Sequence, residues 1–315
     1  MLVGAVCYGG LYCCFPAKLY TGGMKEAVNR AERRISVHGV ERHYLACFGG
    51  DKPPSGLPVV MMLHGAGDTA RGAMFQTGWA QKAVSDNFIA VFPEALRGDM
   101  RRPPSFDDNP QMWNDCSGRG WSYENKISDV EFLSAVIDDL SVSFAADAGK
   151  IFLTGFSNGA SMAFCAAAVM PDKFAAIAPV AGHCWAENAK PFKHPVPLLY
   201  MVGGADKLNP VDGGDVKVPW GIVKKPPVEK TFRKWAALCG CSGAEPRLWR
   251  EGALVLKDFS PCPGGESTKY CEIAGLGHHW AGGHNALGEE VAGPKLDKPD
   301  ATALIWDFFK SMMRL

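Results

Sequence analysis

The sequence feature that most constrains the fold is a Gly-x-Ser-x-Gly pentapeptide at residues 155–159. An apolar run from Ile151 to Thr154 precedes it and is typical of a buried strand. An Ala- and Met-rich stretch follows at helical density and ends at Pro171. Strand, pentapeptide and helix in this order predict a nucleophile elbow, which places Ser157 on a sharp turn at the start of the helix. The alternative is an ordinary strand-to-helix turn whose serine caps the helix.

The glycines of this pentapeptide and of a second loop indicate how a substrate oxygen could be held. Gly155 and Gly159 suit a turn that leaves no room for side chains two residues before and after the serine. Free backbone N–H groups at the start of the following helix stabilise developing negative charge. A glycine-rich loop at 64–68 follows another apolar run, so its backbone can approach a substrate closely, although it also reads as an ordinary turn. We expect the N–H groups of Asn158 and Ala66 to form an oxyanion hole.

Strands and helices alternate along most of the chain. Apolar runs typical of buried strands lie at 57–63, 88–92, 151–154, 174–180, 197–202, 254–256 and 270–273. Helical periodicity is found at 74–85, 127–144, 230–238 and 301–313. Alternating residues at 34–48 predict a hairpin that turns near His38. This order predicts an α/β fold, with a mostly parallel central sheet, helices on both faces and ligands at the carboxyl ends of the strands.

We expect one catalytic domain over residues 34–315 and a poorly ordered leader over residues 1–33. A chain of 315 residues can bury one large core, and no change in composition or long polar linker marks a boundary. The stretch from Met1 to Gly23 is apolar and rich in Gly, Cys and Tyr, but it lacks the basic start of a signal peptide. Two interpretations stay open: the remnant of a trimmed export or lipoprotein signal, and a disordered leader.

The net charge and the cysteine content limit which partners the protein is expected to bind and in which compartment it is expected to function. The formal net charge is zero, so nothing favours nucleic acid or an anionic membrane, and no apolar run is long enough to span a bilayer. Disulfides explain the eleven cysteines better than thiols or zinc do, because the spacing of the C-terminal group does not match usual zinc sites. That group is Cys239, Cys241, Cys262 and Cys271, and a further candidate pair is Cys116 and Cys184. Disulfides indicate a secreted or periplasmic protein, lipid-anchored if the leader is a lipoprotein signal.

The chain also supplies candidates for the base and the acid that a serine nucleophile needs. In an elbow fold the acid follows the serine along the chain, and the histidine comes last. Asp206 follows a predicted strand and a Gly-Gly pair, but Asp212 and Asp215 lie in the same loop. His278 and His279 both follow the last predicted strand, and chain order alone does not choose between them.

Aromatic and histidine side chains near the predicted strand ends are candidates for substrate contact. The long polar insertion at 97–126 carries several aromatic residues, and such long loops are often functional. The alternative is that these rings only pack the loops against the core. The predicted substrate-binding residues are His64, Trp113, His183, Trp185, His279 and Trp280.

Five motifs together resemble the secreted esterase family of polyhydroxybutyrate depolymerases and feruloyl esterases, which are α/β-hydrolases. They are Leu63-His64-Gly65, Gly155-Phe-Ser-Asn-Gly159, Ala178-Pro-Val-Ala-Gly182, Gly203-Gly-Ala-Asp206 and Gly277-His278-His279-Trp280-Ala-Gly282. In that family the catalytic histidine stands two residues before a tryptophan, which corresponds to His278, and the acid corresponds to Asp206. Family members often carry Pro where this chain has Ala281, and the segment 216–227 looks inserted, so substrate preference stays open.

The resemblance implies a monomeric serine carboxylic-ester hydrolase that works through an acyl-enzyme, with no metal and no organic cofactor. The implied substrates are polyhydroxyalkanoate polyesters or oligomers, feruloyl or acetyl esters of plant polysaccharide, or aromatic esters. Three alternatives stay open, namely an acyltransferase on the same scaffold, a peptidase, and a non-catalytic binding relative. The last of these would bind sugar or polymer on a platform of Trp113, Trp121, Trp220 and Trp280.

Overall fold

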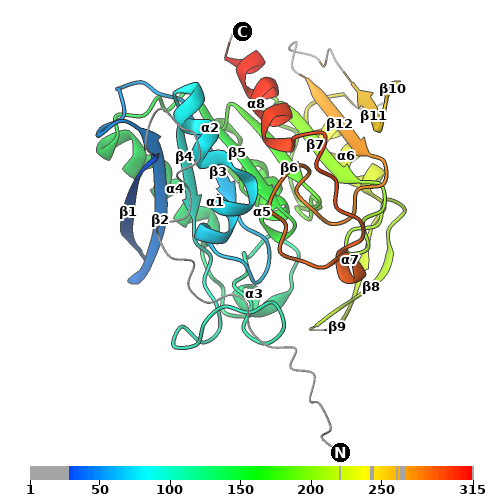
Figure 1. Cartoon of the computed structure of the whole chain (residues 1–315), viewed down its shortest axis with the longest axis horizontal. Helices are drawn as coiled ribbons and strands as arrows, with labels where there is room; N and C mark the ends of the chain where they lie inside the picture. Colours follow the sequence, from blue (N-terminus) through cyan, green and yellow to red (C-terminus); the bar gives the residue numbers. More distant parts are fainter. Residues whose placement is uncertain (1–27, 220, 242–244, 260–261, 263–266, 314–315) are drawn as a thin grey trace, which may run out of the picture.

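The computed structural model describes residues 28–219, 221–241, 245–259, 262 and 267–313, and its centre is a ten-stranded sheet (Figure 1). In spatial order the strands are β1 (Val28–Val37), β2 (Val40–Gly49), β4 (Ile89–Pro93), β3 (Val59–Leu63), β5 (Ile151–Phe156), β6 (Ala176–Val180), β7 (Leu198–Gly203), β12 (Thr268–Ile273), β11 (Leu254–Asp258) and β10 (Arg247–Glu251). The six strands from β4 to β12 run parallel, and both edges are antiparallel. A separate hairpin pairs β8 (Gly214–Val218) with β9 (Gly221–Lys225).

Helices cover both faces of the sheet, and each face has its own apolar core. The helices are α1 (Ala70–Thr77), α2 (Trp79–Asp86), α3 (Gly120–Glu124), α4 (Asp129–Ser143), α5 (Asn158–Val169), α6 (Val228–Leu238), α7 (Glu289–Ala292) and α8 (Ala301–Met312), with a short 3₁₀ turn at Pro171–Lys173. The first core takes buried residues from α4, α5 and α6, and the second takes them from α1, α2 and α8.

The central strand β3 shows why the run at 57–63 is apolar throughout. Val59 and Met61 belong to the first core, whereas Val60 and Met62 belong to the second. None of the four has any exposed surface. A strand that is buried on both faces of a parallel sheet has no position where a polar side chain would reach water.

The predicted α/β fold with a mostly parallel sheet is confirmed, although several individual elements differ from the prediction. The segment 74–85, predicted as one helix, falls in α1 and α2, because Gly78 adopts a left-handed conformation (φ 69°) between them. The segment 216–227, predicted as an insertion, contains most of the β8–β9 hairpin. Strand β10 was not predicted, since all of its side chains are exposed and give no apolar run.

The sheet begins before the predicted domain boundary. Residues 28–33, predicted as part of the leader, belong to β1 and pair with β2. The remainder of the leader, residues 1–27, lies outside the described residues, and so does Trp220. The division into a leader and one catalytic domain therefore stays a prediction.

Two disulfides join segments that are distant in the sequence. Cys241 bonds to Cys262, within the predicted C-terminal group. Cys116 bonds to Cys165, which lies on α5, so its predicted pairing with Cys184 is wrong and Cys184 is a buried thiol. The second half of the 97–126 insertion is thereby tied to the helix that follows Ser157. None of the helices in the described part of the chain has the length and apolarity that a membrane crossing requires.

Candidate active site

Ser157 occupies a sharp turn between β5 and α5, as the pentapeptide predicts. Its backbone angles are φ 56° and ψ −116°, which a non-glycine residue rarely adopts. A side chain at Gly155 would bring a Cβ within 2.4 Å of the Gly159 carbonyl oxygen, and one at Gly159 would lie 2.2 Å from the Leu63 carbonyl oxygen. The two glycines are therefore required by close backbone contacts on either side of the turn.

Three side chains from three loops form a hydrogen-bonded chain. Oγ of Ser157 lies 2.9 Å from Nε2 of His278, and Nδ1 of His278 lies 2.8 Å from Oδ2 of Asp206. The second carboxylate oxygen of Asp206 accepts hydrogen bonds from the N–H groups of Leu208 (2.8 Å) and Asn209 (2.6 Å). Both His278 and Asp206 are buried. The three loops follow β5, β7 and β12, whose carboxyl ends lie at one edge of the sheet because the strands are parallel.

The neighbouring histidine points elsewhere. Nε2 of His279 donates to the carbonyl oxygen of Gly293 (2.8 Å), and burial lowers the pKa of the His279 side chain. Of the two adjacent histidines, His278 alone lies within hydrogen-bond distance of Ser157 in the described structure. The geometry therefore favours His278 over His279 as the base, in agreement with the family resemblance.

Two backbone N–H groups next to Ser157 are available to a substrate oxygen. The N–H of Asn158 is the first of α5, so it has no partner within the helix. Within the described residues, neither it nor the N–H of Ala66 bonds to a backbone carbonyl. The loop that carries Ala66 is held from both sides, because Gly67 N–H donates to the Gln111 carbonyl (2.9 Å) and Trp113 Nε1 donates to the carbonyl oxygen of His64 (2.9 Å).

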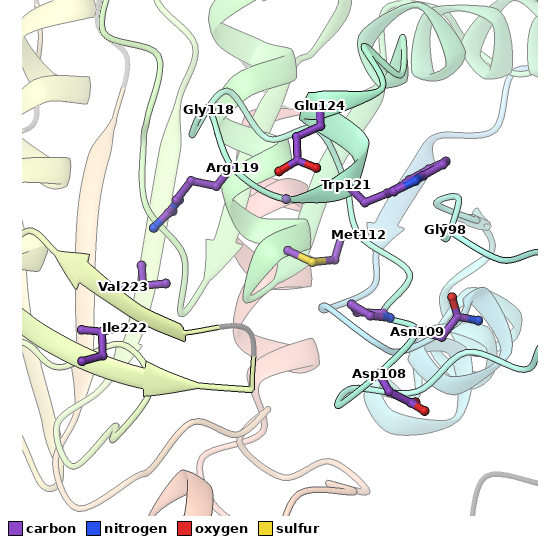
Figure 2. Close-up of a pocket in the computed structure, with 12 residues that line it drawn as sticks. Gly98, Asp108, Asn109, Met112, Gly118, Arg119, Trp121, Glu124, Ile222 and Val223 are labelled. Carbon is purple, nitrogen blue, oxygen red and sulfur yellow. The ribbon is translucent and has the colours of Figure 1, made fainter.

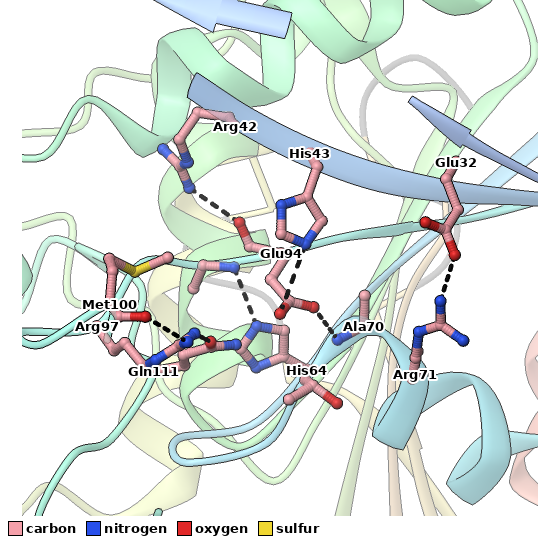
Figure 3. Close-up of polar contacts among 12 residues, drawn as sticks. Glu32, Arg42, His43, His64, Ala70, Arg71, Glu94, Arg97, Met100 and Gln111 are labelled. Carbon is pink, nitrogen blue, oxygen red and sulfur yellow. Dashed lines mark hydrogen bonds and ion pairs between the residues drawn. The ribbon is translucent and has the colours of Figure 1, made fainter. Parts of the chain in front are cut away.

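A polar network fixes the start of this loop (Figure 3). The Ala95 N–H donates to Nε2 of His64 (3.1 Å). The carboxylate of Glu94 accepts from the Ala70 N–H at the start of α1 (2.7 Å) and lies 3.6 Å from Nε2 of His43. Burial alone would raise the pKa of Glu94, but the contact with His43 and the Ala70 N–H outweigh it and hold this pKa at about 2. Glu94 therefore stays ionised and holds the start of α1 next to the loop that follows β3.

The side chain of Asn158 connects the elbow to the 97–126 insertion. Its Oδ1 accepts from the Trp113 N–H (2.7 Å), and its Nδ2 donates to Oδ2 of Asp115 (2.9 Å). The disulfide between Cys116 and Cys165 makes a second, covalent connection between the insertion and α5. The insertion is thus a fixed wall beside Ser157.

The hydrogen-bonded chain opens into a cavity of about 1070 Å³. This volume suffices for a small ester or a short oligomer. Two of the predicted substrate-binding residues, Trp185 and His279, line it. Sequence reasoning missed several apolar lining residues, which lie on α1, in loops and on the β8–β9 hairpin. They include Met74, Phe75, Phe106, Met112, Leu208 and Val223.

The other four predicted substrate-binding residues are buried behind the cavity and do not line it. They are His64, Trp113, His183 and Trp280. Both ring nitrogens of His64 bond to backbone groups, and Nε1 of Trp280 donates to Oγ1 of Thr302 (3.0 Å). Nδ1 of His183 lies 3.0 Å from Oγ1 of Thr231, and burial lowers the pKa of His183 to about 3. These side chains position the walls of the site.

Arg119 and Lys225 also line the cavity and were not predicted. Arg119 precedes α3, and Lys225 ends β9. No group of three or more His, Cys, Asp or Glu side chains within the described residues is arranged to hold a metal ion.

Comparisons with known proteins show that the chain is similar to esterases and to a depolymerase. The model of the phospholipase/carboxylesterase family matches residues 50–216. NocK of Nocardia uniformis subsp. tsuyamanensis, provisionally named an esterase, is 30% identical over 274 residues, which are 80% of this chain and 74% of that protein. Poly(3-hydroxyalkanoate) depolymerase C of Paucimonas lemoignei is 28% identical over 133 residues, which are 41% of this chain and only 28% of the depolymerase.

Among solved structures, the acetyl xylan esterase from Aspergillus awamori has a similar fold. Its TM-score is 0.57 at 14% sequence identity, and the match covers 79% of this chain and 94% of that one. At this level of identity the likeness concerns the fold alone.

Proposed function

Because the chain belongs to the phospholipase/carboxylesterase family of α/β-hydrolases, we propose that it hydrolyses carboxylic esters with Ser157, His278 and Asp206 as nucleophile, base and acid. The matches to known proteins also confirm the resemblance inferred from the motifs. The observation that carries the proposed mechanism is the continuous hydrogen-bonded chain of these three side chains at the wall of a large cavity.

The mechanism follows from the two hydrogen bonds of His278. Its Nδ1–H donates to Asp206, so Nε2 is free to accept the proton of Ser157 as the serine oxygen attacks the ester carbonyl. The N–H groups of Asn158 and Ala66 stabilise the oxyanion, and Asp206 stabilises the imidazolium. His278 then protonates the departing alcohol, and a water molecule cleaves the acyl-enzyme by the same steps in reverse order.

The apolar lining of the cavity supports the proposal that the substrates are esters with aliphatic or aromatic groups. We place polyhydroxyalkanoate oligomers first, because the depolymerase relative acts on such a polymer, and acetyl or feruloyl esters second. The disulfides between Cys116 and Cys165 and between Cys241 and Cys262 support an exported protein, since such bonds persist in oxidising compartments.

The test is hydrolysis of p-nitrophenyl butyrate, combined with labelling by a fluorophosphonate. We expect turnover and labelling in the wild type and neither in Ser157→Ala. Ser161→Ala is the matched control, because Ser161 also lies on α5 and lines the cavity but does not contact His278. A Ser157→Ala variant that keeps wild-type turnover would remove Ser157 from its assigned role.

A further inference from the structure

One end of the cavity carries two positively charged side chains that form no salt bridge with a described Asp or Glu. Arg119 comes from the 97–126 insertion, and Lys225 from the β8–β9 hairpin. Figure 2 shows the Arg119 side chain directed toward Val223 of β9, across an adjoining cavity of about 600 Å³. The two segments that sequence analysis marked as insertions therefore meet at this end of the cavity.

Trp185 brings the two cations near each other. Cζ of Arg119 lies 4.4 Å from the centroid of the Trp185 ring, and Nζ of Lys225 lies 6.0 Å from it. Both contacts are attractive, but two like charges that are partly removed from water repel each other. Burial lowers the pKa of Arg119, and burial with the nearby Arg119 charge lowers the pKa of Lys225 to about 8. Such a pair is costly until an anion neutralises it.

The other arginines of the cavity already have an anionic partner. Arg71 forms a salt bridge with Glu32, and Arg30 lies 3.9 Å from the same carboxylate. Those two arginines therefore share a carboxylate in direct ion pairs, whereas Arg119 and Lys225 form no salt bridge within the described residues.

The acidic neighbours of the two cations form no salt bridge with them within the described residues. Asp115 lines the same cavity and attracts both cations, but its carboxylate accepts hydrogen bonds from Nδ2 of Asn158 (2.9 Å) and from the Ser117 N–H (3.2 Å). Asp206 also attracts Lys225, but its carboxylate is held by His278 and by the N–H groups of Leu208 and Asn209. An anionic group on the substrate would give the two cations the direct ion pair that neither carboxylate supplies.

We propose that Arg119 and Lys225 bind a free carboxylate of the ester substrate, an inference that rests on the proposed esterase function. One molecule can reach both the cations and Ser157, because all three line one cavity. Guanidinium and ammonium groups form strong charge-assisted hydrogen bonds with carboxylates. A linear oligomer of a hydroxy acid has such a carboxylate at one end and an ester bond one unit away. The substrate class is therefore acidic esters, and oligomers are cleaved from the carboxyl end.

The experiment compares linear dimers and trimers of 3-hydroxybutyrate as free acids and as primary carboxamides, with release of monomer measured by chromatography. We expect the wild type to prefer the acids. In Arg119→Gln/Lys225→Gln, kcat/KM for the acids should fall by roughly 10- to 100-fold, the range for lost hydrogen bonds to charged groups, whereas that for the carboxamides should change less than about twofold. Lys224→Gln is the matched control, because Lys224 is the exposed neighbour on β9 and does not line the cavity.

The carboxamides and p-nitrophenyl butyrate separate the two proposals. If the wild type cleaves these neutral esters without preferring the acids, or if the double variant loses acids and carboxamides alike, carboxylate binding is overturned and the esterase function stands. If no ester is cleaved, both the proposed esterase function and the proposed carboxylate binding are overturned. The single variant Lys225→Gln is a control for misfolding. If it keeps full turnover of the carboxamides, a loss of activity toward the acids is not caused by misfolding.

Discussion

Nδ1 of His278 lies 2.8 Å from Oδ2 of Asp206, although 72 residues separate them in the chain. The hydrogen bond joins the loops after β12 and β7, which are neighbouring parallel strands. The other oxygen of Asp206 accepts two backbone N–H groups, so the carboxylate cannot rotate without losing them. The sheet and this turn together set the orientation of the imidazole toward Ser157.

Replacing Asp206 by Asn tests this orientation. The amide of Asn would donate to Nδ1 of His278, which would leave the proton on Nε2 and prevent it from accepting the Ser157 proton. We expect kcat for p-nitrophenyl butyrate to fall on the order of 10³- to 10⁴-fold in Asp206→Asn, with a normal thermal transition. Asp212→Asn, in the same loop and exposed, should retain activity. The reverse pattern would transfer the acid role to Asp212.

Replacing Gly159 by Ala tests the close approach at the elbow. The added Cβ would lie 2.2 Å from the Leu63 carbonyl oxygen, which is backbone and cannot move independently of β3. We expect Gly159→Ala to lower the free energy of unfolding by roughly 2–3 kcal/mol and to reduce kcat sharply, measured by urea unfolding and ester hydrolysis. Gly149→Ala is the control, since Gly149 is exposed and its nearest contact is a side-chain oxygen at 3.3 Å. Equal stability of the two variants would contradict the prediction.

Removing the disulfide between Cys116 and Cys165 tests the wall beside Ser157. The bond closes a loop over a sequence separation of 49, so we expect Cys116→Ala/Cys165→Ala to lose roughly 3–4 kcal/mol of stability. Activity should fall as well at temperatures where the variant is folded, because the insertion contacts Asn158. Cys241→Ala/Cys262→Ala should lose a similar free energy but keep its activity, since this disulfide does not hold the insertion that contacts Asn158. Calorimetry and ester hydrolysis would distinguish the two outcomes.

Glu94 provides a pH-dependent test of the network under the loop after β3. Its pKa of about 2 lies below the value of 4.5 expected for an unperturbed glutamate, so its contribution is fully present above pH 4.5 and is lost as the pH falls toward 2. We expect Glu94→Gln to lower the free energy of unfolding by about 2 kcal/mol at pH 7 and by much less near pH 2.5. Glu41→Gln removes an exposed ion pair with Arg34 and should change stability by under about 0.5 kcal/mol. If the difference in free energy of unfolding between wild type and Glu94→Gln does not vary with pH, the low pKa assigned to Glu94 is wrong.

Much of the fold could be predicted from the sequence because its signals are local. A strand buried on both faces, such as β3, shows as an unbroken apolar run, and the elbow at Ser157 shows as two glycines at fixed positions. The chain order of acid and base reduced the candidates to a few residues. The choice between His278 and His279 needed either the family resemblance or the structure, since adjacent residues differ only in where their side chains point.

The substrate contacts could not be predicted in the same way, because they depend on how distant segments pack. His64 follows β3 and Trp113 lies in the 97–126 insertion, yet the packing of these segments buries both side chains. Arg119 and Lys225 lie in two insertions that are distant in the sequence. No sequence pattern indicates that both side chains lie beside Trp185. The partner of Cys116 was missed for the same reason, since connectivity follows from the path of the chain in space.

The final prediction uses the pKa of Lys225, which is about 8, to test carboxylate binding by pH. Lys225 faces Arg119, Asp115 and Asp206, and its ammonium group loses its charge as the pH rises through about 8. We expect the kcat/KM ratio of 3-hydroxybutyrate dimer acid to its carboxamide to fall as the pH rises through about 8, because the site then holds one cation instead of two. The ratio removes the titration of the catalytic base, which both substrates share, and kcat/KM reports groups of the free enzyme.

Arg119 keeps its charge throughout this range, so the preference for the acid should decrease without disappearing. In Lys225→Gln the ratio should be lower than in the wild type at pH 7 and should not vary between pH 7 and pH 9. Lys224→Gln should follow the wild-type curve. If the wild-type ratio stays constant while Lys225→Gln lowers it, Lys225 acts through packing and not through its charge, because only the charged form can attract a carboxylate.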